Sequence, residues 1–328
     1  MRVAFPALLA DIGGTNVRFA MLARANAPLS DCLRFETGGV PDCAAAVQMA
    51  CRKAGWPMPA SLLLGAAGAI SGRSVRLTNA AWVIDGPALA QRLGLRQGLL
   101  LNDFETLALA LPALASDDLM PIGAGLSGHG TRLIVGPGTG LGVGALIRAG
   151  QTLMPVSSEG GHAALAAGSP AEHRLFARLA ADGRSLSAES LLAGPALTRL
   201  RLAFDPACPP DAARPPAIVE AALEGDPACR QVIDLWLTLL ARFCAGMALT
   251  FLATGGVFLA GGILPRLRSL IDAAAFRAAF EDNSAHAELL GRIPVQLVTA
   301  QEPGLIGLEA LARAPERYLL DYAGRAWC

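Results

Sequence analysis

The feature that most constrains this chain is a glycine-rich turn between two apolar runs, which occurs twice. In the first copy, residues 8–20, the turn is Asp11-Ile12-Gly13-Gly14-Thr15-Asn16. In the second, residues 133–143, it is Gly138-Thr139-Gly140. This pattern predicts a strand, a tight turn and a returning strand. Glycines let the backbone approach a ligand and turn its N–H groups outward, which suits phosphate oxygens. Either turn alone also fits an ordinary hairpin; the repetition favours two turns that grip one nucleotide.

Asp11 is the one carboxylate in the first turn. A carboxylate beside a phosphate requires an intervening cation, most simply Mg²⁺ or its bound water. Arg18, two residues past the turn, either reaches a ligand or is a surface residue of the returning strand, and the surface position is the one expected. A third glycine pair, Gly261-Gly262, follows the short apolar run 257–260, which we expect to be another strand.

A candidate general base lies where a predicted strand meets a predicted helix. Residues 97–101 are apolar and run into Asn102-Asp103-Phe104-Glu105, with a helix expected to about Leu111. In open α/β sheets, ligands bind at the carboxyl ends of strands, which favours Asp103. The alternative is structural: Asn102 and Glu105 fit a capping box, which leaves Asp103 as a favourable acid in the first helical turn.

Two further segments carry candidate ligand-binding side chains. Glu159-Gly160-Gly161-His162 is expected to be a loop because of its two glycines, and it offers an acceptor and a donor for ligand hydroxyls. A simple carboxylate–histidine pair on the surface explains it equally well. Glu189 precedes an apolar helical pattern, so it is either a ligand contact or an acid that favours the helix N-terminus.

Composition excludes several classes of function. The formal net charge of 0 gives no electrostatic reason to expect nucleic acid or a membrane surface as a partner. Seven scattered cysteines without a Cys-x-x-Cys pair argue against a zinc site and a disulfide framework. Lys53 is the only lysine, so a Walker-type phosphate lysine is absent. The uncharged stretch 243–264 is interrupted by Gly255-Gly256, which predicts a buried core helix and then a strand rather than a membrane span.

The segments occur in the order found in the bacterial glucokinase family, within the sugar kinase, actin and heat-shock chaperone ATPase superfamily. The chain resembles this family over about residues 8–308. The matching pieces are Asp11 to Asn16, Leu77-Thr78-Asn79, Asn102-Asp103-Phe104, Gly138 to Gly142, Glu159 to His162, Ser187-Ala188-Glu189, Ala260 to Ile263 and Pro303 to Gly307.

The resemblance implies an α/β fold, the two-domain actin-like ATPase (ribonuclease H-like) fold, with a mixed sheet flanked by helices in each domain. We expect a small domain at 1–112, joined by a C-terminal helix at 302–328, and a large domain at 113–301. The residues after Pro315 carry no motif. A soluble cytoplasmic homodimer is expected.

The resemblance also implies a glucokinase, which transfers the γ-phosphoryl group of ATP to the 6-hydroxyl of glucose. Asp103 would be the general base, and Asp11 would hold Mg²⁺ through water. The residues that would surround ATP are Asp11, Gly13, Gly14, Thr15, Asn16, Gly138, Thr139, Gly140, Gly261 and Gly262. Those that would bind the sugar are Asn79, Asn102, Asp103, Glu159, His162 and Glu189.

Other functions stay open at the level of sequence. A kinase for another hexose, such as mannose or fructose, fits the same carboxylates, and ADP or polyphosphate could replace ATP as donor. A non-catalytic sugar-sensing regulator would most simply lack the base, and no DNA-binding extension is evident. An actin- or chaperone-like ATPase needs further domains, for which 328 residues leave little room.

Overall fold

The fold is described from a computed structural model that covers residues 2–126, 128–181, 183 and 185–327. Met1 and Cys328, the outer limits of the expected domains, lie outside the described residues. The chain divides into two compact units. Unit 1 comprises Met1–Ala115, Gly144–Ser157 and Ala300–Cys328, and unit 2 comprises Ser116–Val143 and Ser158–Thr299.

Unit 1 is built on a mixed six-stranded sheet of order β15-β8-β4-β1-β2-β3. β1 runs antiparallel to β2 and parallel to β4, and β4 runs parallel to β8. A small second sheet has the order β5-β6-β7. The strands are β1 Ala7–Ile12, β2 Asn16–Leu22, β3 Leu33–Glu36, β4 Ser61–Ala66, β5 Ile70–Ser71, β6 Ser74–Arg76, β7 Val83–Asp85, β8 Gln97–Asn102 and β15 Ala326–Trp327.

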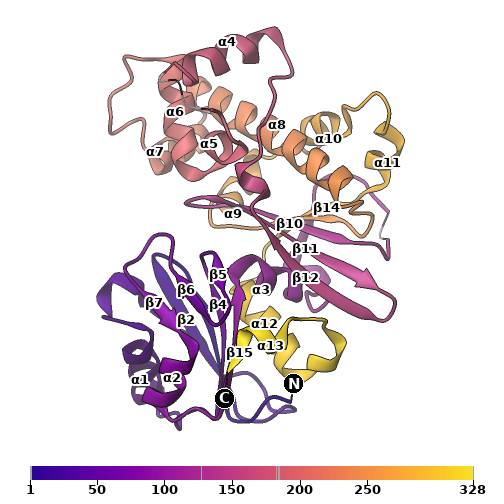
Figure 1. Cartoon of the computed structure of the whole chain (residues 1–328). Coiled ribbons are helices and arrows are strands. Elements are labelled where there is room, and N and C mark those ends of the chain that lie inside the picture. The colour runs from indigo at the N-terminus through magenta and orange to yellow at the C-terminus, as the bar shows by residue number, and fades with distance from the viewer. Residues whose placement is uncertain (1, 127, 182, 184, 328) are drawn as a thin grey trace. The chain divides into compact units, whose positions relative to one another are not determined.

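Helices cover both faces of the larger sheet in unit 1 (Figure 1). α3 (Asp103–Ala110) and α12 (Pro303–Arg313) pack on one face and on each other. α1 (Cys43–Ala54) and α2 (Gly86–Leu93) contribute to the core on the other face. Short 3₁₀ segments occur at Thr37–Gly39 and Pro315–Arg317. Because the parallel strands are covered on both sides, β1 and β4 are almost entirely buried.

The expected C-terminal helix at 302–328 is wrong in extent. α12 ends at Arg313, just before Pro315, a residue that cannot continue a helical hydrogen-bond ladder. The chain then forms the short helix α13 (Tyr322–Arg325) and the edge strand β15 beside β8.

Unit 2 repeats the strand pattern of unit 1. Its sheet has the order β12-β11-β10-β13-β14-β9, in which β10, β13 and β14 are parallel and β9 is antiparallel to β14. The strands are β9 Leu119–Pro121, β10 Arg132–Pro137, β11 Leu141–Ala149, β12 Thr152–Ser158, β13 Val257–Leu259 and β14 Val295–Val298. Most of the β11–β12 hairpin, residues 144–157, groups with unit 1. The first hairpin of each sheet therefore carries one of the two predicted glycine turns, at equivalent places in the strand order.

The long apolar helix α8 (Pro227–Thr250) is the centre of the unit 2 core (Figure 1). By length and composition it would suffice to cross a membrane, but 61% of its most apolar window is buried within the protein. Trp236 on this helix is fully buried, and its indole N–H donates to the carbonyl of Leu192 at 3.1 Å. The prediction of a core helix followed by a strand is confirmed, because β13 follows at Val257.

Other helices of unit 2 surround α8. They are α4 Pro170–Leu179, α5 Ala188–Leu192, α6 Gly194–Phe204, α7 Pro215–Leu223, α9 Leu264–Leu267, α10 Ala273–Glu281 and α11 Ala287–Arg292, with 3₁₀ segments at Ser116–Asp118, Gly160–His162 and Arg268–Leu270. Between α9 and α10 the chain leaves the helical conformation at Ile271 and Asp272, and the Asp272 side chain caps α10 by accepting from Ala274 and Ala275. The N-cap at Asp272 therefore starts a new helix and separates α10 from the helical turns before it.

Candidate active site

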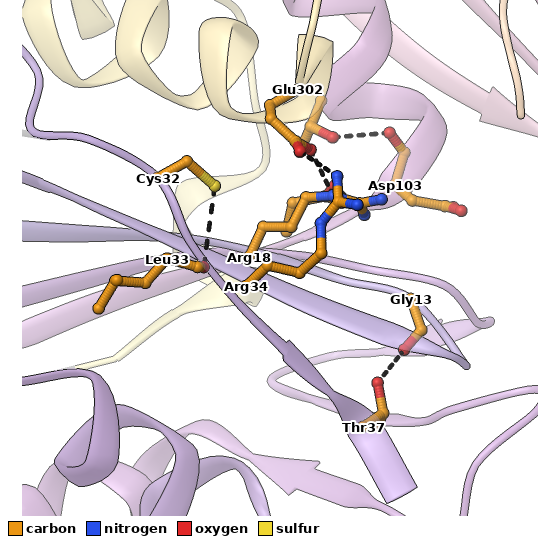
Figure 2. A network of polar contacts seen from close by, with 10 residues as sticks. Gly13, Arg18, Cys32, Leu33, Arg34, Thr37, Asp103 and Glu302 are labelled. Atoms are coloured by element: carbon orange, nitrogen blue, oxygen red, sulfur yellow. Dashed lines mark hydrogen bonds and ion pairs between the residues drawn. The ribbon is translucent and has the colours of Figure 1, made fainter. Parts of the chain in front are cut away.

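The first glycine turn of unit 1 is closed by its own backbone and by a buried threonine. The Gly13 N–H donates to the Asn16 carbonyl at 2.9 Å, which closes the hairpin. Thr37 is fully buried; its hydroxyl donates to the Gly13 carbonyl and its N–H to the Thr15 carbonyl, both at 2.9 Å (Figure 2). A methyl group on Gly14 would come within 2.6 Å of the Asn79 β-carbon, so only glycine fits. The predicted residues Gly13 to Asn16 and Asn79 are therefore brought together.

Asp11, the penultimate residue of strand β1, lies against the first turn of α12. A β-carbon on Gly304 of that helix would lie 3.0 Å from the Asp11 carboxyl carbon. The Arg18 Nη1 atom lies 3.2 Å from Asp11 Oδ2, and Arg18 also pairs with Glu302, which in turn pairs with Arg34 (Figure 2). Burial raises the pKa of the Asp11 carboxyl group, Arg18 opposes this rise, and the Glu302 carboxylate adds to it.

Asp11 and the first glycine turn fit a magnesium ion that is held through water. Among residues 2–126, 128–181, 183 and 185–327, no group of three or more His, Cys, Asp or Glu side chains could cage a metal ion. Mg²⁺ usually keeps several waters and takes one or two carboxylates together with substrate phosphates. Asp11, beside a glycine turn, supplies that kind of donor.

The expected surface position of Arg18 is wrong. Its side chain is 24% exposed and forms ion pairs with two acids. Arg18 lies directly across the hairpin from Asp11 in the strand register. Opposite charges at paired positions attract each other, so this pair was available from the sequence once the hairpin register was counted. Thr37 and Glu302 were missed as well, and no local pattern marks them, because both reach the site from distant segments.

The capping box at the start of α3 is confirmed. The Asn102 side-chain oxygen accepts from the Phe104 N–H at 2.9 Å, and Glu105 Oε2 accepts from the Asn102 N–H at 2.9 Å. The Asn102 amide nitrogen donates to the Gly68 carbonyl at 3.2 Å. Since an amide nitrogen carries two hydrogens, one more can be donated to a ligand.

Asp103 occupies the first position of α3 and is half-buried. Its Oδ1 atom accepts from the Phe104 N–H at 3.1 Å, and the Thr106 hydroxyl donates to its backbone carbonyl at 2.7 Å. Figure 2 shows the Asp103 side chain extending away from the cluster of Arg18, Arg34 and Glu302. The carboxylate is thus anchored by the first turn of its own helix.

The second glycine turn, in unit 2, joins β10 to β11. The Gly138 N–H donates to the Gly140 carbonyl at 2.8 Å, and the Gly194 N–H donates to the Gly138 carbonyl at 2.7 Å. Thr139 at the tip is exposed. Glu189 accepts from the Leu141 N–H at 2.9 Å, and a β-carbon on Gly140 would lie 2.6 Å from the same carboxylate oxygen. Glu189 is therefore fixed against this turn.

Glu159, His162 and Glu189, which the resemblance grouped as sugar-binding residues, lie near one another in unit 2. His162 Nε2 lies 3.7 Å from Glu159 Oε2, and His162 Nδ1 lies 3.8 Å from Glu189 Oε1. The segment Gly160–His162 is a 3₁₀ turn, and a β-carbon on Gly161 would lie 1.9 Å from the Leu141 carbonyl oxygen. Glycine therefore lets this turn pack against β11. Two carboxylates flanking an imidazole offer acceptors and a donor for neighbouring hydroxyl groups.

The third glycine pair, Gly261-Gly262, follows β13 and is exposed. Gly261 has a φ of +99°, and a β-carbon there would lie 2.3 Å from the Pro137 carbonyl oxygen. It is thereby packed against the end of β10, next to the second glycine turn. No heavy atom lies within 4 Å of a β-carbon built on Gly262, among the part of the chain that the structure describes.

The family model, two relatives and a solved structure that match this chain are all glucokinases. The family model for glucokinase matches residues 8–315. The glucokinase of Allorhizobium ampelinum is 37% identical over 98% of this chain and 96% of its own length, and that of Sinorhizobium fredii is 38% identical over 99% and 97%. A glucokinase structure from an Antarctic psychrotroph superposes with a TM-score of 0.83 at 30% identity, covering 94% of this chain and 99% of that one.

A more distant structure shows the same fold. The ROK family glucokinase from Streptomyces griseus, solved in complex with glucose and AMPPNP, has a TM-score of 0.64 at 21% identity, covering 94% of this chain and 99% of that one. The fold and the site thus define an ATP-dependent hexose kinase with the two-domain actin-like architecture. The chain belongs to the glucokinase family, and glucokinase activity is its function.

Proposed function

We propose that this chain transfers the γ-phosphoryl group of ATP to the 6-hydroxyl of glucose, with Asp103 as general base. The observation that carries this proposal is the placement of Asp103 at the carboxyl end of β8, in the unit that also holds Asp11 and the first glycine turn. Ligands of open α/β sheets bind at this end of the strands. The Streptomyces griseus structure with glucose and AMPPNP supports both substrates.

Binding of ATP is assigned to the glycine segments. The N–H groups of Gly13 and Gly138 close their own turns, so the phosphate donors would be the other N–H groups of residues 14–16 and 139–140. Asp11 would bind Mg²⁺ through water, and the ion would offset phosphate charge. Gly261 and Gly262 would lie against the adenosine, where an exposed surface without side chains admits a flat ring.

Binding of the sugar is assigned to hydroxyl-directed side chains. In unit 2, Glu159, His162 and Glu189 would accept from and donate to the hydroxyls, and in unit 1, Asn79 and Asn102 would do the same. Each hydroxyl that a competing sugar lacks would leave one of these groups unpaired, which is an effective basis for selectivity.

The chemistry assigned to the chain is a proton transfer coupled to phosphoryl transfer. As the 6-hydroxyl oxygen forms its bond to the γ-phosphorus, the bond from that phosphorus to the β–γ bridging oxygen breaks, and ADP leaves. Asp103 takes the hydroxyl proton and later releases it to water. Positioning and charge stabilisation supply most of the catalysis in reactions of this type.

The proposal also covers the division into domains, the assembly of the protein and the alternative sugars. The proposed division is a small domain at 1–112, joined by the segment from 302, and a large domain at 113–301. A cytoplasmic homodimer is the expected assembly, and sedimentation at several protein concentrations tests it. Mannose and fructose are the alternative acceptors.

A panel of substrates tests the proposal. Phosphate transfer from Mg-ATP to glucose, mannose and fructose is measured by ADP release, and the glucose product is identified with glucose 6-phosphate dehydrogenase. We expect glucose to have the highest kcat/KM, and E159Q to raise the KM for glucose roughly tenfold or more, because a charged hydrogen bond is lost. The matched control is E288Q, which should leave the KM for glucose unchanged. The Glu288 side chain is 83% exposed, close to the 80% of the Glu159 side chain. A higher kcat/KM with mannose or fructose would overturn the substrate assignment.

A further inference from the structure

The segment after α12 is built into the sheet that carries the candidate base. Ala326 and Trp327 pair antiparallel with Leu99 and Gly98 of β8, the strand that leads directly into Asn102 and Asp103. Trp327 is 2% exposed. A β-carbon on Gly98 would lie 2.3 Å from its indole ring, so the indole lies directly on the backbone of β8.

One residue of this segment reaches the capping box of α3. The Arg325 Nη1 atom donates to both carboxylate oxygens of Glu105, at 2.8 and 2.6 Å. Glu105 is only 3% exposed, and its Oε2 atom also accepts from the Asn102 N–H. A single buried carboxylate therefore joins Arg325 to the backbone at the start of α3.

We propose that Arg325 is a positioning residue for phosphoryl transfer, acting through Glu105 on the helical turn that holds Asp103. This inference rests on the proposed role of Asp103. Without Arg325, Glu105 would be a buried carboxylate that has lost its cationic partner. It would turn towards water, and this change weakens its bond to the Asn102 N–H. The first turn of α3 would loosen, and with it the position of the Asp103 carboxylate.

A hollow beside Glu105 and Arg325 gives the Glu105 side chain room to move if Arg325 is replaced. A hollow of about 430 Å³ is lined by Glu105, Arg325, Asp321 and residues 154–157 and 319–320. A Glu105 side chain released from Arg325 can therefore turn into solvated space without unfolding the helix. Displacement of a catalytic group by about 1 Å costs on the order of 100-fold in rate.

The test compares R325M with R325K. Only one nitrogen of Arg325 makes the contact, so an ammonium group can replace it. We expect R325M to lower kcat on the order of 100-fold, with the KM for ATP unchanged within about threefold, and R325K to recover most of the loss. R317M is the control, because Arg317 is an exposed arginine in the same segment. Backbone hydrogen exchange in residues 99–110 should accelerate in R325M and not in R317M.

Non-additivity gives a second measurement. Arg325 and Glu105 are expected to act through the same ion pair, and E105Q removes the charge that Arg325 neutralises. Once that pair is lost, the second substitution has nothing further to remove, so E105Q/R325M should lose no more activity than the worse single variant. Unchanged kcat and exchange in R325M would overturn the inference, as would equal losses in R325M and R325K. D103N is assayed alongside: if it retains activity, the base assignment fails, whereas loss in D103N with full activity in R325M refutes only the role of Arg325.

Discussion

The crossing of α3 and α12 provides a sharp test of how the candidate base is held. A β-carbon on Gly307 of α12 would lie 1.9 Å from the backbone carbonyl oxygen of Thr106 and 2.9 Å from the Ala110 nitrogen, both on α3. Carbon–oxygen contacts in proteins require about 3.3 Å. G307A must therefore separate the two helices by more than about 1 Å, since backbone atoms cannot rotate away.

Both stability and activity should respond to this substitution. Overpacking of a buried interface costs roughly 1–3 kcal/mol. A shift of about 1 Å in the turn carrying Asp103 would lower kcat on the order of 100-fold. The assays are urea denaturation followed by tryptophan fluorescence and the coupled glucose 6-phosphate assay.

The matched control is G246A in α8. No heavy atom lies within 4 Å of a β-carbon built there, among the described residues. Alanine should stabilise this helix by roughly 0.5–1 kcal/mol and leave kcat unchanged. If G307A were as stable and as active as the parent, this tight crossing would neither limit packing nor position the base.

Two further predictions concern buried groups of unit 1. T37V keeps the shape of Thr37 but removes the donor to the Gly13 carbonyl, so it should cost about 1–2 kcal/mol and raise the KM for ATP several-fold; an unchanged urea midpoint and KM would contradict this. Burial raises the pKa of the Cys43 thiol from its ordinary 9.0 to about 12. Below pH 9 the thiol is protonated in both the folded and the unfolded chain, so its contribution to the free energy of unfolding is complete. Between pH 9 and 12 the thiol ionises in the unfolded chain but not in the folded one, and the free energy of unfolding falls by up to ~1.4 kcal/mol per pH unit. Urea titrations at pH 8 to 10.5 should show a shallower decline for C43A, and identical slopes would refute the assignment.

Sequence reasoning succeeded where residues close in the chain determine the structure. The two hairpins, the capping box of Asn102 and Glu105, and the break after α8 all follow from local patterns, and each is present in the structure. The resemblance grouped Glu159, His162 and Glu189 as sugar-binding residues, and their side chains lie near one another. Their role in binding the sugar stays a prediction.

Contacts between segments that are distant in the chain could not be predicted from the sequence. Thr37 supports the first glycine turn from the 3₁₀ segment after β3, and Glu302 reaches Arg18 across a long separation in the chain. Neither shows a period or a motif. The C-terminal segment carried no signal because the small residues that accept Trp327, Gly86 and Gly98, lie more than 200 positions earlier. Close approaches of this kind become visible only in three dimensions.

The role of Asp103 as the base of the glucokinase reaction is tested by the variant D103N. Single-turnover formation of glucose 6-phosphate from Mg-ATP is measured for the parent, for D103N and for D31N, which alters an exposed acid of the same unit. Glucose affinity is measured by calorimetry on the same samples. We expect a loss of roughly 100-fold or more in D103N, with glucose still bound and D31N unaffected. Full single-turnover activity in D103N would contradict it.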